Sequence, residues 1–107
     1  LFVNAGHIEA TAPHQIPCFD AAVLFARTEG HLPAPESSHA VRVAVDEALA
    51  CKEAGESKAI VFNLSGHGHF DLSSYQKYFE NELQDYEYPA HEIEESLKRL
   101  PEVSVQV

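Results

Sequence analysis

Two short segments of the chain carry residue types that could hold a small molecule. The first runs from Ser65 to Asp71 and reads Ser-Gly-His-Gly-His-Phe-Asp. Gly66 and Gly68 allow the backbone to approach a ligand closely, and the Ser65 hydroxyl is placed to point at it. The same residues also fit a tight turn whose glycines only relieve steric crowding, and the pattern alone does not separate the two interpretations.

The second segment, 27–40, passes through two prolines and then enters a helix. Glu36 and His39 lie one helical turn apart at the start of that helix. A carboxylate and an imidazole on one face could face a ligand. A capped surface helix is the alternative interpretation.

The elements around these segments predict where they lie. The run 59–64, Ala-Ile-Val-Phe-Asn-Leu, is nearly all apolar and rich in β-branched and aromatic residues, which favours a strand covered on both faces. Ligands bind beyond the carboxyl ends of strands in open α/β sheets, and Ser65 follows this strand directly. Such a strand needs neighbours to pair its backbone groups.

Apolar spacing and turn residues predict four helices, at 17–28, at 36–54, after Asp71 with a stripe reaching Leu83, and at 89–100. Short strands are predicted at 8–11 and at 103–107. The resulting fold class is α/β, with helices packed on a small, mainly parallel sheet. We expect residues 1–107 to form a single partial domain.

Composition narrows the function classes. The chain has 107 residues and a net charge of -10, so binding to a polyanion such as DNA is disfavoured. No apolar run approaches the roughly 20 residues of a membrane span, and no secretory signal is visible, so we expect a cytoplasmic protein. Its two cysteines, Cys18 and Cys51, are expected to be free thiols. Because the chain has no methionine and begins at Leu1, we expect it to be a piece of a longer protein.

Three stretches follow one another in an order that is typical of one family. They are Glu29-Gly30, then Pro-Ala-Pro-Glu-Ser-Ser-His-Ala at 33–40, then Phe-Asn-Leu-Ser-Gly-His-Gly at 62–68. Together they resemble the C-terminal part of the tryptophan synthase β chain, and are closer to the second type of that chain than to the common type. The segment Asp-Tyr-Glu-Tyr-Pro at 85–89 also resembles the ending of the second type. The resemblance covers nearly the whole chain.

The resemblance implies a fold-type II enzyme that uses pyridoxal phosphate to join L-serine and indole, giving L-tryptophan and water. Ser65 matches the family serine that faces the pyridine nitrogen of the cofactor, where a neutral hydroxyl moderates the ring as an electron sink. Gly66 and Gly68 would pack beside the ring, and Glu36 matches a glutamate near it. His67 stands where the common type has arginine.

The resemblance also implies that the cofactor pocket is incomplete in this chain. The Schiff-base lysine, the phosphate cradle and the glutamate that acts on the reacting carbons belong to the N-terminal part of the family. No catalytic residue is therefore expected on this piece, which should be inactive alone. Its expected partners are the remainder of the β chain, a second copy in a homodimer, and an α-type subunit.

Two other functions remain open from the residues. His67, His69 and Asp71, with His39 nearby, have ligand types that suit zinc. A non-catalytic oligomerisation or partner-binding module is the other alternative, since an unpaired strand edge favours association. A nucleophilic hydrolase is disfavoured because Asn63 stands where a nucleophile elbow requires glycine.

Overall fold

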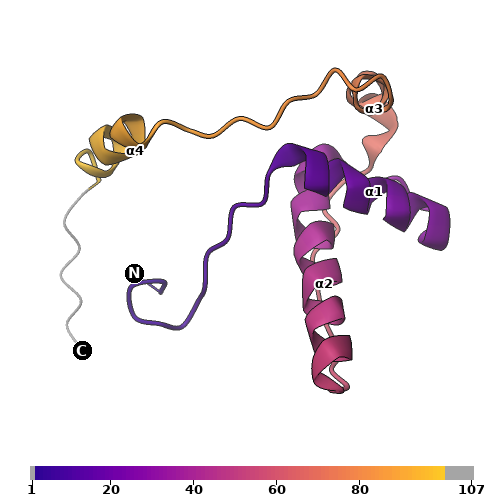
Figure 1. Cartoon of the computed structure of the whole chain (residues 1–107), viewed down its shortest axis with the longest axis horizontal. Helices are drawn as coiled ribbons and strands as arrows, with labels where there is room; N and C mark the ends of the chain where they lie inside the picture. The colour runs from indigo at the N-terminus through magenta and orange to yellow at the C-terminus, as the bar shows by residue number, and fades with distance from the viewer. Residues whose placement is uncertain (1, 101–107) are drawn as a thin grey trace. The chain divides into compact units, whose positions relative to one another are not determined.

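The computed structural model describes residues 2–100 of the chain. It contains α1 (Gln15–Glu29), α2 (Pro35–Ala54), the short 3-10 turn η1 (Gly68–Phe70), α3 (Leu72–Phe79) and α4 (Ala90–Leu97), as Figure 1 shows. The four predicted helices are therefore confirmed. The third ends at Phe79, short of the predicted Leu83, and Asn81 beyond it adopts a left-handed backbone with φ of 58°.

The chain divides into two compact units, one of which is Pro13–Asp85 and holds α1, α2, η1 and α3. The other consists of the two flanking segments; its described part contains an N-terminal turn and α4, in which no residue is buried. The predicted functional segments all lie in Pro13–Asp85, so the site is built within that unit.

The predicted α/β fold is wrong. Residues 2–100 contain no strand and no sheet, and the only pairing of this kind within them is an isolated antiparallel bridge between Pro33 and His67. The predicted strand at 59–64 has no regular secondary structure and no ladder partner, and Val61 is 93% exposed. Its composition suits a strand, but a strand also needs neighbours to pair its N–H and C=O groups, and the described chain supplies none.

The two other predicted strands have different outcomes. Residues 8–11 form no strand, and Ile8 is 54% exposed. The strand predicted at 103–107 lies outside the described residues. The tube without arrows between α2 and α3 in Figure 1 shows that helices alone make up the regular structure of the described chain.

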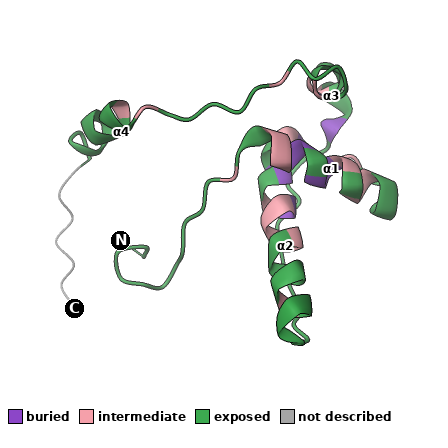
Figure 2. Cartoon of the chain, in the orientation of Figure 1, coloured by how far each residue is buried: buried purple, intermediate pink, exposed green. Residues whose placement is uncertain are grey.

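The core of the unit lies where α1 meets α2 and α3. Phe19, Ala22 and Tyr75 are buried together, and the Phe19 ring packs edge-on against Tyr75 with the ring centroids 5.0 Å apart. Val41 of α2 is 1% exposed. Figure 2 shows buried residues in α1, around the start of α2 and at η1, while the second half of α2 is mostly exposed; Tyr75 of α3 is buried as well. The core is therefore small and lies directly beside the two functional segments.

Both cysteines are free, as predicted. Cys18 is 2% exposed, and burial raises the pKa of its thiol, against a smaller opposing effect of Arg42. A raised pKa keeps the thiol protonated, so Cys18 is a packing residue and a poor nucleophile.

The N-terminus of α1 is stabilised from a distance. His14 precedes the helix and makes no capping bond, and the first turn contains no acidic residue. The carboxylate of Asp85 instead accepts a hydrogen bond of 2.9 Å from the Ile16 N–H, and the Gln15 amide donates to the Gln84 carbonyl. The negative charge of Asp85 also interacts favourably with the positive N-terminal end of the helix dipole.

Tyr75 couples α3 to the loop before α2. Its hydroxyl donates a 2.6 Å hydrogen bond to the carbonyl of Pro33, which is fully buried. Burial, the largest effect, raises the pKa of Tyr75. The neutral phenol is therefore the form that the fold favours.

We expect Tyr75→Phe to lower the free energy of unfolding by about 1–3 kcal/mol, because it leaves a buried carbonyl without a donor. Urea denaturation would measure this, with the exposed Tyr86→Phe as the control. Since the folded pKa of Tyr75 is raised, its contribution is complete below about pH 10 and is lost as the pH rises through that folded pKa. In Tyr75→Phe, the free energy of unfolding should therefore fall less steeply as the pH rises above about 10. An equal alkaline loss in both variants would contradict this.

We expect Asp85→Ala to lower the free energy of unfolding by about 1 kcal/mol, because it removes the acceptor at the first turn of α1. Amide hydrogen exchange at Ile16 should accelerate, whereas Glu87→Ala, two residues further along, should leave it unchanged. Equal exchange at Ile16 in the two variants would show that Asp85 does not cap the helix.

Candidate functional site

The two segments singled out in the sequence are held together by a pair of backbone hydrogen bonds. The Ala34 N–H donates to the Gly66 carbonyl at 3.3 Å, and the Gly68 N–H donates to the Leu32 carbonyl at 2.8 Å. These two bonds make the bridge between Pro33 and His67. The structure thus brings 32–34 and 66–68 into direct contact, although more than thirty residues separate them in the sequence.

The two glycines of the bridge have different requirements. Gly66 has a φ of +122°, a region that side chains rarely tolerate, and is exposed. Gly68 has an ordinary φ but is buried, and a Cβ there would lie 2.6 Å from the Pro33 carbonyl oxygen and 2.9 Å from the Tyr75 ring. Gly66 therefore permits the turn and Gly68 permits the close packing.

Ser65 is held at the N-terminus of α2. The Ser37 hydroxyl donates a 3.0 Å hydrogen bond to the Ser65 carbonyl, and Ser37 itself is 4% exposed. Ser65 and Glu36 are both exposed, and Glu36 immediately precedes Ser37 in the first turn of the helix. The backbone of Ser65 is thus fixed beside the turn that carries Glu36, while its hydroxyl is accessible.

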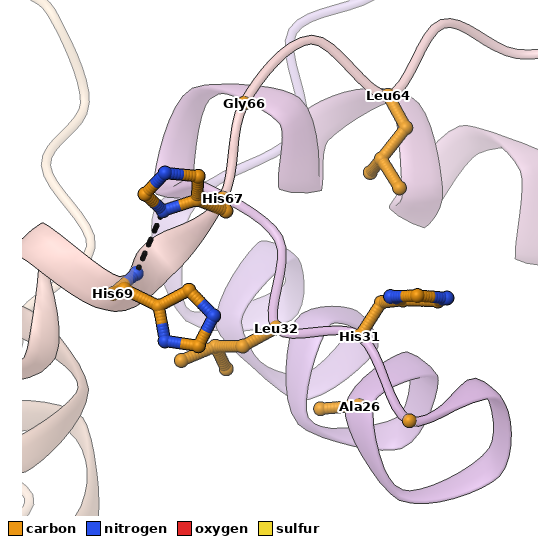
Figure 3. A pocket seen from close by; sticks show the side chains of 8 residues that line it. Ala26, His31, Leu32, Leu64, Gly66, His67 and His69 are labelled. Carbon is orange, nitrogen blue, oxygen red and sulfur yellow. Dashed lines mark hydrogen bonds between the residues drawn. The ribbon is translucent and has the colours of Figure 1, made fainter.

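A hollow of about 430 Å³, called the histidine hollow below, lies on the His67 side of the bridge and contains His31, His67 and His69. Figure 3 shows His31 at one side and His67 with His69 at the other, with Leu32 between them. The His67 Nδ1 accepts a 3.3 Å hydrogen bond from the His69 N–H. A second, smaller hollow of about 180 Å³ contains Glu36 and His39.

The five residues predicted to contact a cofactor are therefore distributed over different environments. Gly66 and His67 line the larger hollow, whose three histidines are His31, His67 and His69. Glu36 lines the smaller hollow. Ser65 lines neither hollow, and Gly68 is buried beneath Tyr75. The structure brings Ser65 and Gly66 together with the turn that carries Glu36, and places the His67 ring in the hollow that Gly66 also lines.

The residues of the metal alternative are not assembled. Among residues 2–100, no three His, Cys, Asp or Glu side chains are placed to hold a metal ion. His39 lines a different hollow from His67 and His69. Asp71 precedes α3 as expected for a cap, but its side chain makes no capping bond.

Three residues of the site escaped the sequence reasoning. They are Ser37 and Tyr75, which fix the loops, and His31, which completes the histidine hollow. The only signal for Tyr75 was its place on an apolar stripe. Its hydrogen bond to Pro33 joins residues 42 positions apart, a distance at which local patterns carry no information.

Close relatives match these segments. The chain is 68% identical over 80 residues to the tryptophan synthase beta chain 2 of Methanosarcina acetivorans. The matched residues make up 75% of this chain and 18% of that protein. The chain is homologous to a portion of the tryptophan synthase β chain. It is also 63% identical over 82 residues to the beta chain 2 of Aquifex aeolicus, with 77% of this chain and 19% of that one covered. The tryptophan synthase beta chain of Pyrococcus horikoshii is 53% identical over 87 residues, covering 81% and 19%.

These matches confirm the recognition of the β chain from its motifs. The chain spans about a fifth of the length of these relatives, whose names are those of a lyase-type enzyme family. No protein-family model matches the chain. Within residues 2–100, no helix of this β-chain portion is both long and apolar enough to cross a membrane.

We expect Gly68→Ala to lower the free energy of unfolding by about 1–3 kcal/mol, because the new methyl group overlaps the Pro33 carbonyl and the Tyr75 ring. The Tyr75 ring signals in an NMR spectrum should move as the bridge shifts. Gly30→Ala is the control, because a Cβ at Gly30 strains its own backbone at φ +73° but meets no neighbour. If Gly68→Ala leaves the Tyr75 signals in place, the bridge does not depend on a glycine at this position.

Proposed function

We propose that this chain is the C-terminal portion of a pyridoxal-phosphate-dependent tryptophan synthase β chain, and that it supplies the pyridine-ring side of the cofactor pocket. The complete chain would join L-serine and indole to give L-tryptophan and water. The observation that carries the proposal is the bridge between 32–34 and 66–68, because it holds the two family segments in contact without help from the rest of the β chain.

The residues present fit the ring side of the cofactor. Ser65 offers an exposed hydroxyl on a backbone tied to Ser37, and Gly66 adds no side chain beyond it. A hydroxyl can donate to a ring nitrogen without carrying charge, whereas a carboxylate there would favour the protonated ring. When bound, pyridoxal phosphate supplies the electron sink for reactions at the amino-acid carbons.

The other proposed contacts have narrower roles. Glu36 would tune the ring by its negative charge from the first turn of α2. Gly68 acts indirectly, by allowing the close packing that sets the height of the loop. His67 would sit at the margin of the pocket, because its ring lines the histidine hollow rather than the surface beside Ser65.

The remainder of the β chain would supply the lysine and the phosphate cradle. None of the four lysines lines either hollow of the site. Lys58 donates to Glu56, and this hydrogen bond raises the pKa of the Lys58 amine. A more basic amine stays protonated and is a poor nucleophile. We therefore propose the remainder of the β chain as the first partner, with a homodimer and an α-type subunit as further ones.

The proposal is tested by cofactor binding in a split enzyme. The 107-residue chain would be mixed with an N-terminal segment of the Methanosarcina acetivorans β chain that lacks the matching region. We expect absorbance and borohydride trapping to detect pyridoxal phosphate on the mixture and not on the 107-residue chain alone. Ser65→Ala should weaken binding roughly 10-fold, the effect of one hydrogen bond to a polar group, and Ser57→Ala should not.

Each outcome decides between the functions. Cofactor trapped on the 107-residue chain alone would contradict the proposed division of the pocket. No cofactor on the mixture, together with a stable oligomer of the chain alone, would favour the non-catalytic module instead.

A further inference from the structure

The proposed function uses Gly66 and His67 of the histidine hollow but gives no role to His31 or His69. The hollow is formed by the end of α1, the loop after it and the segment 64–69, and three of its eight lining residues are histidines. Ser65 does not line it. A volume of about 430 Å³ is in the range of small-molecule sites, which begins at about 300 Å³.

The lining has no negative charge to balance its imidazoles. The chain as a whole carries a net charge of -10, yet no Asp or Glu lines this hollow. No Lys or Arg lines it either, so imidazoles are its only charged or chargeable groups. A ligand with a negatively charged acceptor would meet imidazole N–H donors here, without competition from a carboxylate of the lining.

The tautomer of His67 selects the kind of ligand. Its Nδ1 accepts a hydrogen bond from the His69 N–H, so the neutral ring carries its proton on Nε2 and presents a donor. A metal-bound histidine shows the opposite arrangement, in which the second ring nitrogen donates to a protein acceptor. The geometry therefore favours an acceptor such as a carboxylate over a metal ion.

The side chains that line the hollow argue against phosphate. Phosphate sites are built from several free N–H groups or from Arg and Lys side chains. No Arg or Lys lines this hollow, and the N–H groups of Gly30 and His69, which do line it, are already bonded within the protein. The apolar side chains of the lining are those of Ala26, Leu32 and Leu64, which favour an apolar ligand body.

We propose that the hollow between His31, His67 and His69 is a binding site for a small organic carboxylate with an apolar, ring-sized body. The carboxylate accepts from His67 Nε2 and is balanced by the neighbouring imidazoles. The apolar body rests on Leu32 and Leu64. This site adjoins the surface beside Ser65, because Gly66 and His67 belong to both, but its carboxylate contacts are to histidines rather than to Ser65.

The probe is benzoate, added to the 107-residue chain at about pH 6, where imidazole is partly protonated. Histidine ring signals would be followed by NMR. We expect the signals of His31, His67 and His69 to shift in a saturable way, while those of His39 and His91 stay in place. Benzamide, which has the same shape but no charge, should bind roughly 10-fold more weakly.

A variant separates donation from packing. His67→Phe keeps an aromatic ring in place and removes both the Nε2 donor and the acceptor of the His69 N–H, so benzoate affinity should fall roughly 10-fold. His39→Phe, in the other hollow, should leave the affinity unchanged. If His67→Phe perturbs the fold, the comparison of benzoate with benzamide on the unaltered chain still decides the question.

Four results would overturn the proposal. Equal binding of benzoate and benzamide would make the hollow merely apolar. Equal shifts of all the histidine signals would indicate unspecific ion binding. Inorganic phosphate that shifts the same three histidines more strongly than benzoate would assign the site to a different anion. Stoichiometric zinc held by His67 and His69 would assign it to a metal.

Discussion

The site depends on one short contact, the pair of backbone hydrogen bonds between 32–34 and 66–68. The contact sets the positions of the neighbouring groups on both segments. Pro33 presents its carbonyl to Tyr75, Gly68 lies against the Tyr75 ring, and Ser65 reaches the first turn of α2. The bridge is possible because Gly66 takes a backbone conformation closed to other residues and Gly68 leaves room for a carbonyl.

The bridge also explains why a small core suffices for this unit. Few of the described residues are buried, and they lie in α1, the loop before α2, the first half of α2, η1 and α3. Polar contacts reinforce this core from its margin. The Tyr75 hydroxyl and the Ser37 hydroxyl each satisfy a loop carbonyl that the helices could not reach. Loops that would otherwise be mobile are thereby tied to the helices, and the exposed residues of the site inherit a fixed backbone.

The sequence predicted the helices well because their signals are local. Left-handed glycines at Gly30 and Gly55 end α1 and α2, and glycine just after an apolar helical pattern is a local signal for a helix end. The predicted sheet was wrong for a different reason. The composition of the β-branched run at 59–64 indicates only that its residues favour a strand. Strand formation also needs a pairing partner, which the described chain does not contain. Among the site residues, Ser65 and Gly66 were found from their motif. Tyr75 and Ser37 act through long-range contacts, and no local pattern reveals those.

The hydrogen bonds between the start of α1 and Gln84 and Asp85 join residues 69 positions apart. They lie at the two ends of the unit Pro13–Asp85, so the chain enters and leaves this body at one place. Closing so long a loop is entropically costly and is among the slower steps of folding, but it has a topological benefit. A unit whose two ends lie close together can be inserted into a larger polypeptide at one point, and the surrounding fold is interrupted only at that point.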